Sequence, residues 1–398
     1  MNLRFARWLT APVILVVACG MYRAAQGPEP PDLVLVRDRP WTINPLQDDP
    51  RVVTNEQLHA VLARVRLPIG SPDTNKIIHA LRLWGPSADF GKKYWSGAAM
   101  RDYLTNDVAY RTHAGEGAPP LLTWALDGTA VRPARQGDPH VATGSVHVDD
   151  LLATLGEIGM PLDAHLETRE GTMTVRQLLT RAMRRFHYSQ AEYEWSAISY
   201  ARYVFPTLSW RNDHGQKIDV DGLIDELVRR PLRQGVCAGT HRVEALVVLL
   251  RADDQARVLK PAERRRIIEH LRRVADLLTA SQHAQGYWSK NWPEGAASLT
   301  EENPPLADRI LATGHHLEWL ALAPPEVQPP RESIVRAAQW LVRAMQEVDD
   351  RSLDIEYGPF SHAARALSLW RGSEAFTAWR MTMPASRPPA KGGFQRSK

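Results

Sequence analysis

The stretch that decides the fold reads Gly235-Val-Cys-Ala-Gly-Thr-His-Arg-Val-Glu-Ala-Leu-Val-Val-Leu-Leu250. A polar turn that contains glycine leads into His241, then Glu244, and then an almost wholly apolar run. A helix that is apolar all round is one that is buried on all sides. The stretch therefore predicts an interior helix that starts near His241.

The same pattern returns twice in the second half of the chain. The segments are Thr313-Gly-His-His-Leu-Glu-Trp-Leu-Ala-Leu322 and Phe360-Ser-His-Ala-Ala-Arg-Ala-Leu-Ser-Leu369. In each segment a histidine precedes a charged residue by three positions and a leucine by five. Both segments are therefore expected to be interior helices, with the histidine near the helix start.

Weaker copies of the pattern begin at Lys76 and His147, and Tyr193–Tyr200 falls in the widest gap between copies. Amphipathic segments lie between these stretches, so each pair of helices buries its apolar face only by stacking on its neighbours. We expect an all-α protein, an (α/α)6 toroid of helical hairpins in which six inner helices are ringed by six outer ones.

The repeats predict one toroid domain over residues 55–384, with an insertion at about 85–145 that departs from the pattern. Within the insertion, Leu121–Leu126 and Thr129–Val131 flank Asp127-Gly128. This arrangement is typical of a small β-hairpin with a type I′ turn. Residues 27–54 form a Pro-rich segment that predicts a linker, and residues 385–398 are expected to form a disordered basic tail.

The N-terminus has the features of an export signal. Arg4 and Arg7 precede the apolar stretch from Leu9 to Met21, which is short for a membrane span. Residues 1–26 are therefore expected to be a signal peptide or a lipoprotein signal. Val16-Val-Ala-Cys19 resembles a lipobox, which makes Cys19 the candidate lipidation site, while cleavage near Ala25 and an uncleaved anchor are the alternatives. The chain is expected to be exported to the cell envelope or periplasm, with membrane contact through its N-terminus.

Charge and cysteine usage narrow the function classes. The net charge of +4 is modest for 398 residues, and the arginines at 264–266 and 272–273 are typical of the solvated face of an outer helix. We therefore expect no nucleic-acid partner. Cys19 and Cys237 are the only cysteines, so no disulfide remains once the leader is removed. Cys237 is left as a buried small residue, a metal ligand or a nucleophile.

Two motifs resemble a known superfamily. Gln282-His-Ala-Gln-Gly286-Tyr-Trp288 fits the Gln-x-x-x-Gly-x-Trp pattern of squalene–hopene cyclases and related terpene cyclases. Thr313–Trp319 and Tyr357–Leu367 resemble consecutive inner helices of protein prenyltransferase β subunits, in which an acid, a cysteine and a histidine bind zinc. The resemblance covers about 150 residues from Gly235 onward and implies an exported bacterial branch of this α/α-toroid superfamily.

The chain also departs from these families. The Asp-rich catalytic motifs of the cyclases are absent, and Thr313 and His315 stand where the acid and the cysteine of the zinc site would be. Only His362 matches the zinc-binding pattern as it is. The β subunits also work with a separate α subunit in the cytosol, which does not suit an exported chain.

Helix starts in a toroid converge on one mouth, so a zinc site there is the first functional hypothesis. The candidate metal ligands are Cys237, His315 and His362, because thiolate and imidazole are good zinc ligands and three of them leave one position open for catalysis. The alternative is a structural network in which these side chains bond to neighbouring turns or repeats.

The second hypothesis is a glycan-active (α/α)6 enzyme. Glu244 and Glu318 fall one turn inside their helices, where an apolar wall raises the pKa of a carboxyl group toward that of a general acid, and His241 is the third candidate catalytic residue. The segment from Gly314 to Trp319 faintly resembles sugar epimerases. The simpler reading is that the two glutamates pair with Arg242 or Arg365.

Aromatic residues fit either enzyme, and a third hypothesis needs no chemistry. Tyr357 and the tryptophans can stack on sugars or stabilise a carbocation, or can simply cap the core; these tryptophans are Trp288, Trp292, Trp319 and Trp370. A non-catalytic binding or scaffold module of the envelope is equally consistent with the sequence. The expected partner is accordingly a small molecule, a glycan or an envelope protein.

Overall fold

The computed structural model describes residues 37–71, 73–125, 128–131, 147–204, 209–355 and 357–382. The described chain is mostly helical, which confirms the predicted class at that level. The predicted leader at 1–26 with Cys19, and the predicted tail at 385–398, lie outside the described residues.

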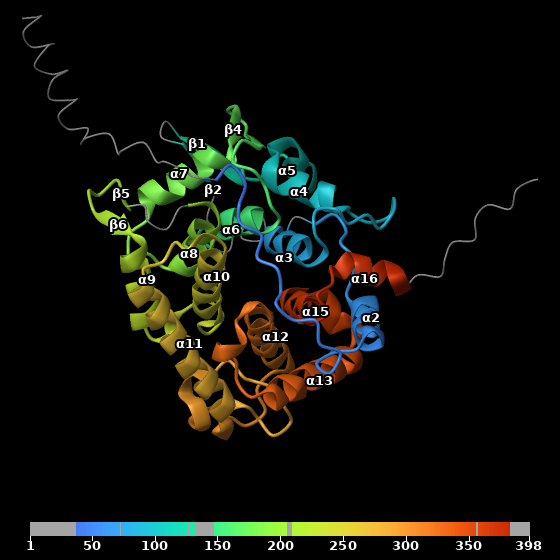
Figure 1. Cartoon of the computed structure of the whole chain (residues 1–398). Coiled ribbons are helices and arrows are strands. Elements are labelled where there is room, and N and C mark those ends of the chain that lie inside the picture. The colour runs from blue at the N-terminus through green and yellow to red at the C-terminus, as the bar shows by residue number, and fades with distance from the viewer. Residues whose placement is uncertain are drawn as a thin grey trace, which may run out of the picture.

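Six buried helices occupy the segments in which interior helices were predicted, and Figure 1 places them around the centre of the view. Each contacts the next in chain order, and the last contacts the first. Their polar residues as well as their apolar ones are largely buried. The six helices are α3 (Thr74–Trp84), α6 (Asp150–Glu157), α8 (Tyr193–Tyr203), α10 (Thr240–Ala256), α12 (Leu306–Leu322) and α15 (Tyr357–Trp370).

The helices between them are amphipathic and lie toward the outside of the view in Figure 1. On α11 one face is apolar and buried, with Ile267, Leu271 and Val274 in the core, as expected for an amphipathic segment. On the same helix Arg264 and Arg266 pair with nearby aspartates. The outer helices are α2 (Asn55–Arg64), α4 (Gly97–Thr105), α5 (Asp107–Ala114), α7 (Val175–Arg185), α9 (Val220–Arg229), α11 (Pro261–Ser281) and α13 (Arg331–Glu347).

Short helices and hairpins complete the described chain. The helices are α14 (Asp350–Ile355), α16 (Ala375–Thr382) and the 3-10 helices η2 (Leu232–Gln234), η3 (Trp292–Thr300) and η4 (Pro325–Val327). The antiparallel pairs are β1 (Leu122–Ala125) with β2 (Gly128–Val131), β3 (His165–Glu167) with β4 (Thr172–Thr174), and β5 (Ser209–Arg211) with β6 (Lys217–Asp219).

The predicted hairpin in the insertion is confirmed. Its register pairs Ala125 with Gly128, so the connection is at residues 126–127 and Gly128 belongs to a strand rather than to the turn. The insertion also contains helices α4 and α5, which the sequence analysis did not predict. Each begins at a side-chain cap, where Ser96 and Asn106 accept backbone N–H groups.

The histidines of α12 and α15 had been predicted to lie at helix starts. This prediction is wrong, because both lie inside their helices. His315 is in the middle of α12, which begins after Pro305, and His362 lies more than one turn inside α15. Gly314 suggested a turn, but it lies inside the helix where α12 and α15 pack closely. A Cβ atom added there would lie 3.0 Å from the backbone nitrogen of Ala363.

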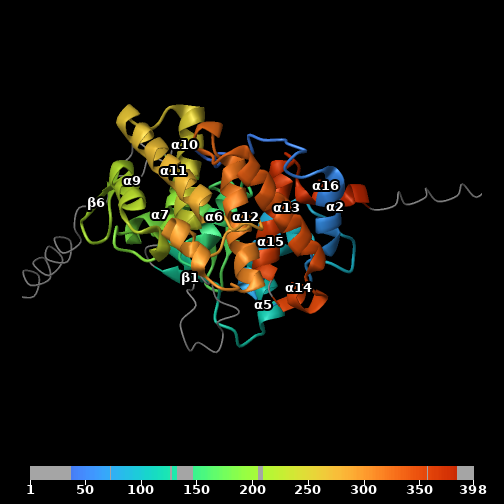
Figure 2. The same ribbon diagram turned by 90° about the horizontal axis from the view of Figure 1, so that it is seen from below.

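Residues 41–53 form a strap across the C-terminal ends of the inner helices, although 27–54 had been predicted to be a linker. Backbone N–H groups of Trp41, Leu46 and Asp49 donate to the last carbonyl groups of α8, α12 and α15. Ile43, Val52 and Val53 are buried. A helix leaves its last carbonyls without intrahelical partners, and the strap supplies donors for them. Figure 2 shows the strap (blue) along one end of the helices, with α5 and α14 toward the other.

The Gln-x-x-x-Gly-x-Trp segment closes the end of α11. Gln282 donates to the carbonyl groups of Gly286 and Ser333, and the Trp288 indole donates to the carbonyl of Leu278. The backbone N–H of Trp288 donates to Thr313 Oγ1 on α12. The segment therefore connects α11 to both α12 and α13. Among the described residues, no helix combines the length and the apolar character needed to cross a bilayer.

Candidate metal centre

Cys237 lies in a tight left-handed turn that immediately precedes α10. Cys237, Ala238 and Gly239 have φ values of 49°, 56° and 86°. Left-handed backbone is costly for residues other than glycine and persists only where the surroundings hold it. Here the Trp292 indole donates to the carbonyl of Ala238 at 2.9 Å, and Thr240 Oγ1 donates to that of Cys237 at 3.0 Å. The thiol is therefore held in place by its neighbours and is only half-buried.

Two histidines near Cys237 are each fixed by a glutamate of the same helix. On α10, His241 Nδ1 lies 3.0 Å from Glu244 Oε2, and on α12, His315 Nδ1 lies 3.2 Å from Glu318 Oε2. An ionised carboxylate only accepts hydrogen bonds, so Nδ1 carries the proton in both rings. In the neutral form of each ring Nε2 then keeps a lone pair, which is the tautomer that ligates a metal through Nε2.

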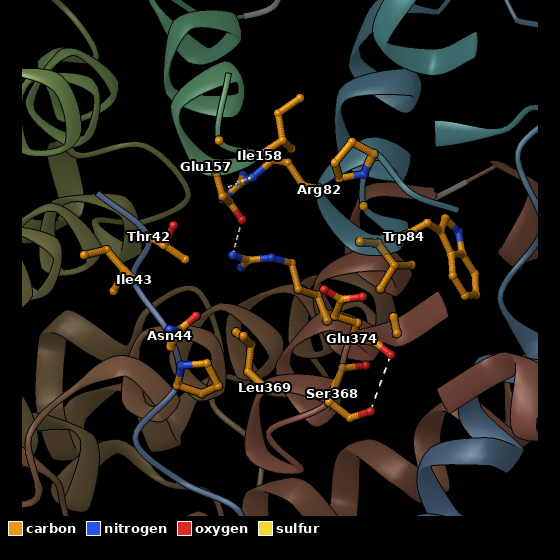
Figure 3. A pocket seen from close by; sticks show the side chains of 18 of the residues that line it. Thr42, Ile43, Asn44, Arg82, Trp84, Glu157, Ile158, Ser368, Leu369 and Glu374 are labelled. Atoms are coloured by element: carbon orange, nitrogen blue, oxygen red, sulfur yellow. Dashed lines mark hydrogen bonds and ion pairs between the residues drawn. The ribbon is translucent and has the colours of Figure 1, made fainter. Parts of the chain in front are cut away.

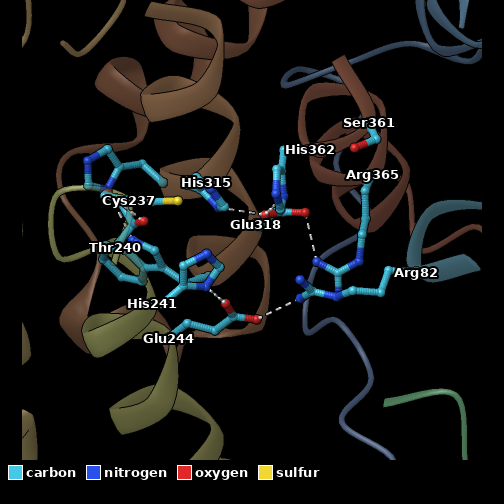
Figure 4. A network of polar contacts seen from close by, with 12 residues as sticks. Arg82, Cys237, Thr240, His241, Glu244, His315, Glu318, Ser361, His362 and Arg365 are labelled. Atoms are coloured by element: carbon cyan, nitrogen blue, oxygen red, sulfur yellow. Dashed lines mark hydrogen bonds and ion pairs between the residues drawn. The ribbon is translucent and has the colours of Figure 1, made fainter. Parts of the chain in front are cut away.

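Cys237, His241 and His315 form a group able to hold a metal ion, with one ligand atom from each residue within 4.8 Å of the others. The ring centroids of His241 and His315 are 4.5 Å apart, and His315 Nε2 is buried without a hydrogen-bond partner. A buried polar atom without a partner is costly. Figure 4 shows the Cys237 sulfur beside the His315 ring, with His241 and Glu244 close by.

His362 belongs to a neighbouring group rather than to that of Cys237. Its Nδ1 lies 2.8 Å from Glu318 Oε2, and it forms a possible metal-binding group with His315 and Glu318. Arg365 already occupies the other oxygen of Glu318 at 2.8 Å. The predicted trio of Cys237, His315 and His362 is thus replaced by one in which His241 takes the place of His362.

A chain of alternating buried charges adjoins the histidines, and Figure 4 shows its members Glu244, Arg82, Arg365 and Glu318. Arg82 joins Glu244 to Glu157 at 3.6 and 2.8 Å, and Arg365 joins Glu157 to Glu318. With Arg202, which Glu157 and Glu244 attract, the three glutamates and three arginines of this network balance, and a Cys237 thiolate adds one negative charge. Buried charges persist when they are neutralised. A cation beside Cys237 would neutralise the thiolate.

For Glu244 and Glu318, predicted to be general acids, the neighbouring cations oppose the expected rise of the carboxyl pKa. Burial does raise the pKa of each carboxyl group, but His241 and Arg82 outweigh it at Glu244 and hold its pKa well below the usual range. His362 and Arg365 do the same for the pKa of Glu318. Both groups are therefore anionic acceptors. The expected pairing of Glu318 with Arg365 is confirmed, whereas Arg242 pairs with Glu194.

Cys237 and His315 shift each other's pKa toward the charged forms, the thiolate and the imidazolium. Burial raises the pKa of the Cys237 thiol, but His315 and His241 reverse this effect and leave the pKa well below its ordinary value. Burial lowers the pKa of His315, whereas Cys237 and Glu318 raise it to about 9. A thiolate and a nearby imidazolium are the form that reacts as a nucleophile and, after loss of the imidazolium proton, the form that binds a metal.

A cavity of about 160 Å³ adjoins the thiol. Its lining includes Cys237, His241 and His362 together with His79, His147 and Trp195. His79 Nδ1 donates to the carbonyl of Asn75 at 2.7 Å, and burial lowers the pKa of His79 to about 3. His79 is therefore neutral, with Nδ1 as its donor. The cavity has room for a few water molecules or a small polar group.

Arg82 and Glu157 were not predicted from the sequence, and His79 was not among the predicted site residues. A signal for two of them existed, because His79 precedes Arg82 by three positions, just as His241 precedes Glu244. The first copy of the pattern had been aligned on Lys76 instead. Glu157 is the last residue of α6, and no sequence pattern indicated that it belongs to the site.

The aromatic residues considered as substrate platforms are in the core. Trp288, Trp292, Trp319 and Trp370 are fully buried, and Tyr357 is nearly so. Each indole donates a hydrogen bond, for example from Trp319 to His316 Nδ1 and from Trp370 to the carbonyl of Leu317. They support the helices and the Cys237 turn.

Comparison of the chain with protein-family models, with curated proteins and with solved structures found no match.

Proposed function

We propose that this chain is an (α/α)6 toroid with a zinc-dependent catalytic centre on Cys237, His241 and His315. The cyclic order of contacts among the six inner helices supports the toroid. The resemblance to prenyltransferases and terpene cyclases, and export to the envelope, belong to the same proposal.

One observation carries the zinc centre. Two imidazoles from different helices have Nδ1 committed to a glutamate and lie beside the same cysteine. A carboxylate behind each ligating histidine is the usual arrangement in zinc sites, and three protein ligands leave a fourth position open. Zinc in such a site lowers the pKa of bound water to about 7. The reaction class is therefore metal-assisted hydrolysis or addition of water to a small polar substrate.

The residues around the open side of the centre support this class. His79 and His362 line the cavity and are neutral, since burial lowers the pKa of both. They can orient a polar substrate and move a proton near the cysteine. The small volume favours a substrate whose reacting end alone enters the cavity.

The test is the metal content of the purified full chain, measured by inductively coupled plasma mass spectrometry. We expect near-stoichiometric zinc, lost in Cys237→Ser and in His315→Asn. His270→Asn is the matched control, because His270 is a buried histidine of α11 outside the group. A folded wild-type chain that takes up no zinc from a buffered zinc solution would refute the proposal.

A second candidate is a cysteine nucleophile activated by His315 and oriented by Glu318. The mutual pKa shifts of Cys237 and His315 favour it, and such a pair makes the thiol reactive below its ordinary pKa. Alkylation by iodoacetamide separates the candidates. Zinc would protect Cys237 in the first, whereas in the second the thiol reacts rapidly at pH 6 whether or not zinc is supplied. A chain that binds no zinc and reacts slowly would leave the envelope binding or scaffold module.

A further inference from the structure

Arg202 is a buried cation without a carboxylate partner. It lies near the end of α8, only 3% of its surface is exposed, and Nη1 donates to the carbonyl of Trp41 at 3.0 Å. Its Nε atom has no hydrogen-bond partner. Within the described part of the chain no carboxylate oxygen lies within ion-pairing distance of Arg202, whereas Arg82 and Arg365 each pair with two glutamates.

The nearby acid is already committed. Glu157 attracts Arg202, but its two oxygens pair with Arg82 and Arg365. Burial lowers the pKa of Arg202 despite that attraction. A guanidinium does not lose its proton in proteins, so the charge remains, and Glu157 and Glu244 attract it from beyond ion-pairing distance. The carbonyl ends of the helices favour a cation here, but that effect is small beside the cost of an unpaired buried charge.

Arg202 lines a cavity of about 690 Å³ under the strap, which we call the strap cavity. Its walls are the strap residues Thr42–Pro45, the end of α3 from Leu81 to Trp84, and Ser368 and Leu369 of α15 (Figure 3). The charged lining residues are Arg82, Arg202, Arg365, Glu157 and Glu374, and serines and apolar side chains lie between them. A volume of this size suits a small organic ligand. Arg82 lines both this cavity and the smaller one beside Cys237.

We propose that the strap cavity binds a small organic oxyanion, whose charged group pairs with Arg202 and whose apolar part contacts the strap and α15. A guanidinium N–H group donates strongly to a carboxylate or a phosphate, and Arg202 lines the cavity without a carboxylate contact of its own. The apolar walls favour an organic acid over a free inorganic ion. This site is separate from the zinc centre.

The experiment measures binding of hexanoate, acetate and inorganic phosphate to the full chain by calorimetry and by thermal shift, at constant ionic strength set with chloride. We expect saturable binding of hexanoate that is tighter than that of acetate. Phosphate that binds while both carboxylates fail would assign the same site to a phosphate ester. No saturable binding of any of the three would overturn the proposal.

Variants assign the site. Arg202→Met is expected to weaken hexanoate binding at least about tenfold, as loss of a charge-assisted pair implies. Asn44→Asp, at an exposed position of the lining, adds a like charge and is expected to weaken binding without removing Arg202. Arg251→Met is the matched control, because Arg251 also donates to a strap carbonyl but has Asp254 nearby and does not line the cavity.

The Cys237→Ser variant keeps this test independent of zinc. Hexanoate binding that persists in Cys237→Ser and is lost in Arg202→Met supports the strap cavity, whatever the metal content. Binding that survives in Arg202→Met, or that disappears in Cys237→Ser, would place the anion elsewhere and overturn the proposal.

Discussion

Glu244 and Glu318 determine which nitrogen of each histidine faces Cys237. Each carboxylate binds Nδ1 and in turn contacts an arginine of another helix, at 3.6 Å for Glu244 with Arg82 and 2.8 Å for Glu318 with Arg365. The ring orientation therefore depends on residues that do not reach the cysteine. Groups behind metal ligands commonly change metal affinity by 10–100-fold when they are altered.

Glu244→Gln is expected to weaken zinc binding about 10–100-fold while leaving the fold intact. The amide keeps the volume of the carboxyl group but removes the charge that fixes the His241 tautomer. Competition with a chromogenic chelator measures the change. Glu226→Gln is the control, because Glu226 pairs with arginines at the surface of α9. If the two variants bound zinc with equal affinity, Glu244 would have no role in metal binding.

At the scale of elements, the sequence predicted helices well and their neighbours poorly. Apolar runs indicated α10, α12 and α15, and the structure shows a capping box of Thr174 and Gln177 at the start of α7. The contacts among helices could not be predicted, because they depend on which faces meet. His241 and Cys237 were identified as candidates from local sequence, whereas Glu157 and Arg202 acquire their roles only through contacts with distant segments.

The close packing of α12 against α15 at Gly314 can be tested by adding a methyl group there. Gly314→Ala is expected to lower the free energy of unfolding by about 1–2 kcal/mol, since overpacking outweighs the roughly 1 kcal/mol gain in helix propensity. The added Cβ would meet backbone atoms of Ala363 and His362 at 3.0–3.2 Å, which cannot move aside as a side chain does. Urea unfolding followed by circular dichroism measures it.

Gly358→Ala on α15 is the matched control for Gly314→Ala. Its Cβ would contact His79 at an ordinary 3.6 Å, so the variant is expected to be neutral or slightly stabilising. If Gly314→Ala had the same free energy of unfolding as this control, the result would contradict the close approach of α12 and α15 at Gly314.

At the scale of the whole molecule, the strap joins the two ends of the described chain. Asp49 donates its backbone N–H to the carbonyl of Trp370, and its carboxylate accepts from Arg331 of α13. Helix α3 contacts α15 through a hydrogen bond from the Trp84 indole to the hydroxyl group of Tyr357. Contacts between such distant segments make the fold depend on both ends, in contrast to an open repeat array, where each repeat touches only its neighbours.

Because the carboxylate of Asp49 is charged, the contribution of the strap to the free energy of unfolding depends on pH. Hydrogen bonds from Arg51 lower the pKa of Asp49, burial opposes them, and Arg331 adds to the lowering, so the pKa lies well below that of a free aspartate. A carboxyl whose pKa is lower in the folded state stabilises the fold above its unfolded pKa of about 4 and loses that contribution as the pH falls.

Asp49→Asn is therefore expected to lower the free energy of unfolding by about 2 kcal/mol at pH 7. The gap from wild type should narrow steadily below about pH 4. Urea titrations across this range measure it, with Asp38→Asn as the control, because Asp38 is 85% exposed and an exposed ion pair contributes little. A gap of constant size down to pH 2 would mean that the charge of Asp49 does not hold the strap to α13.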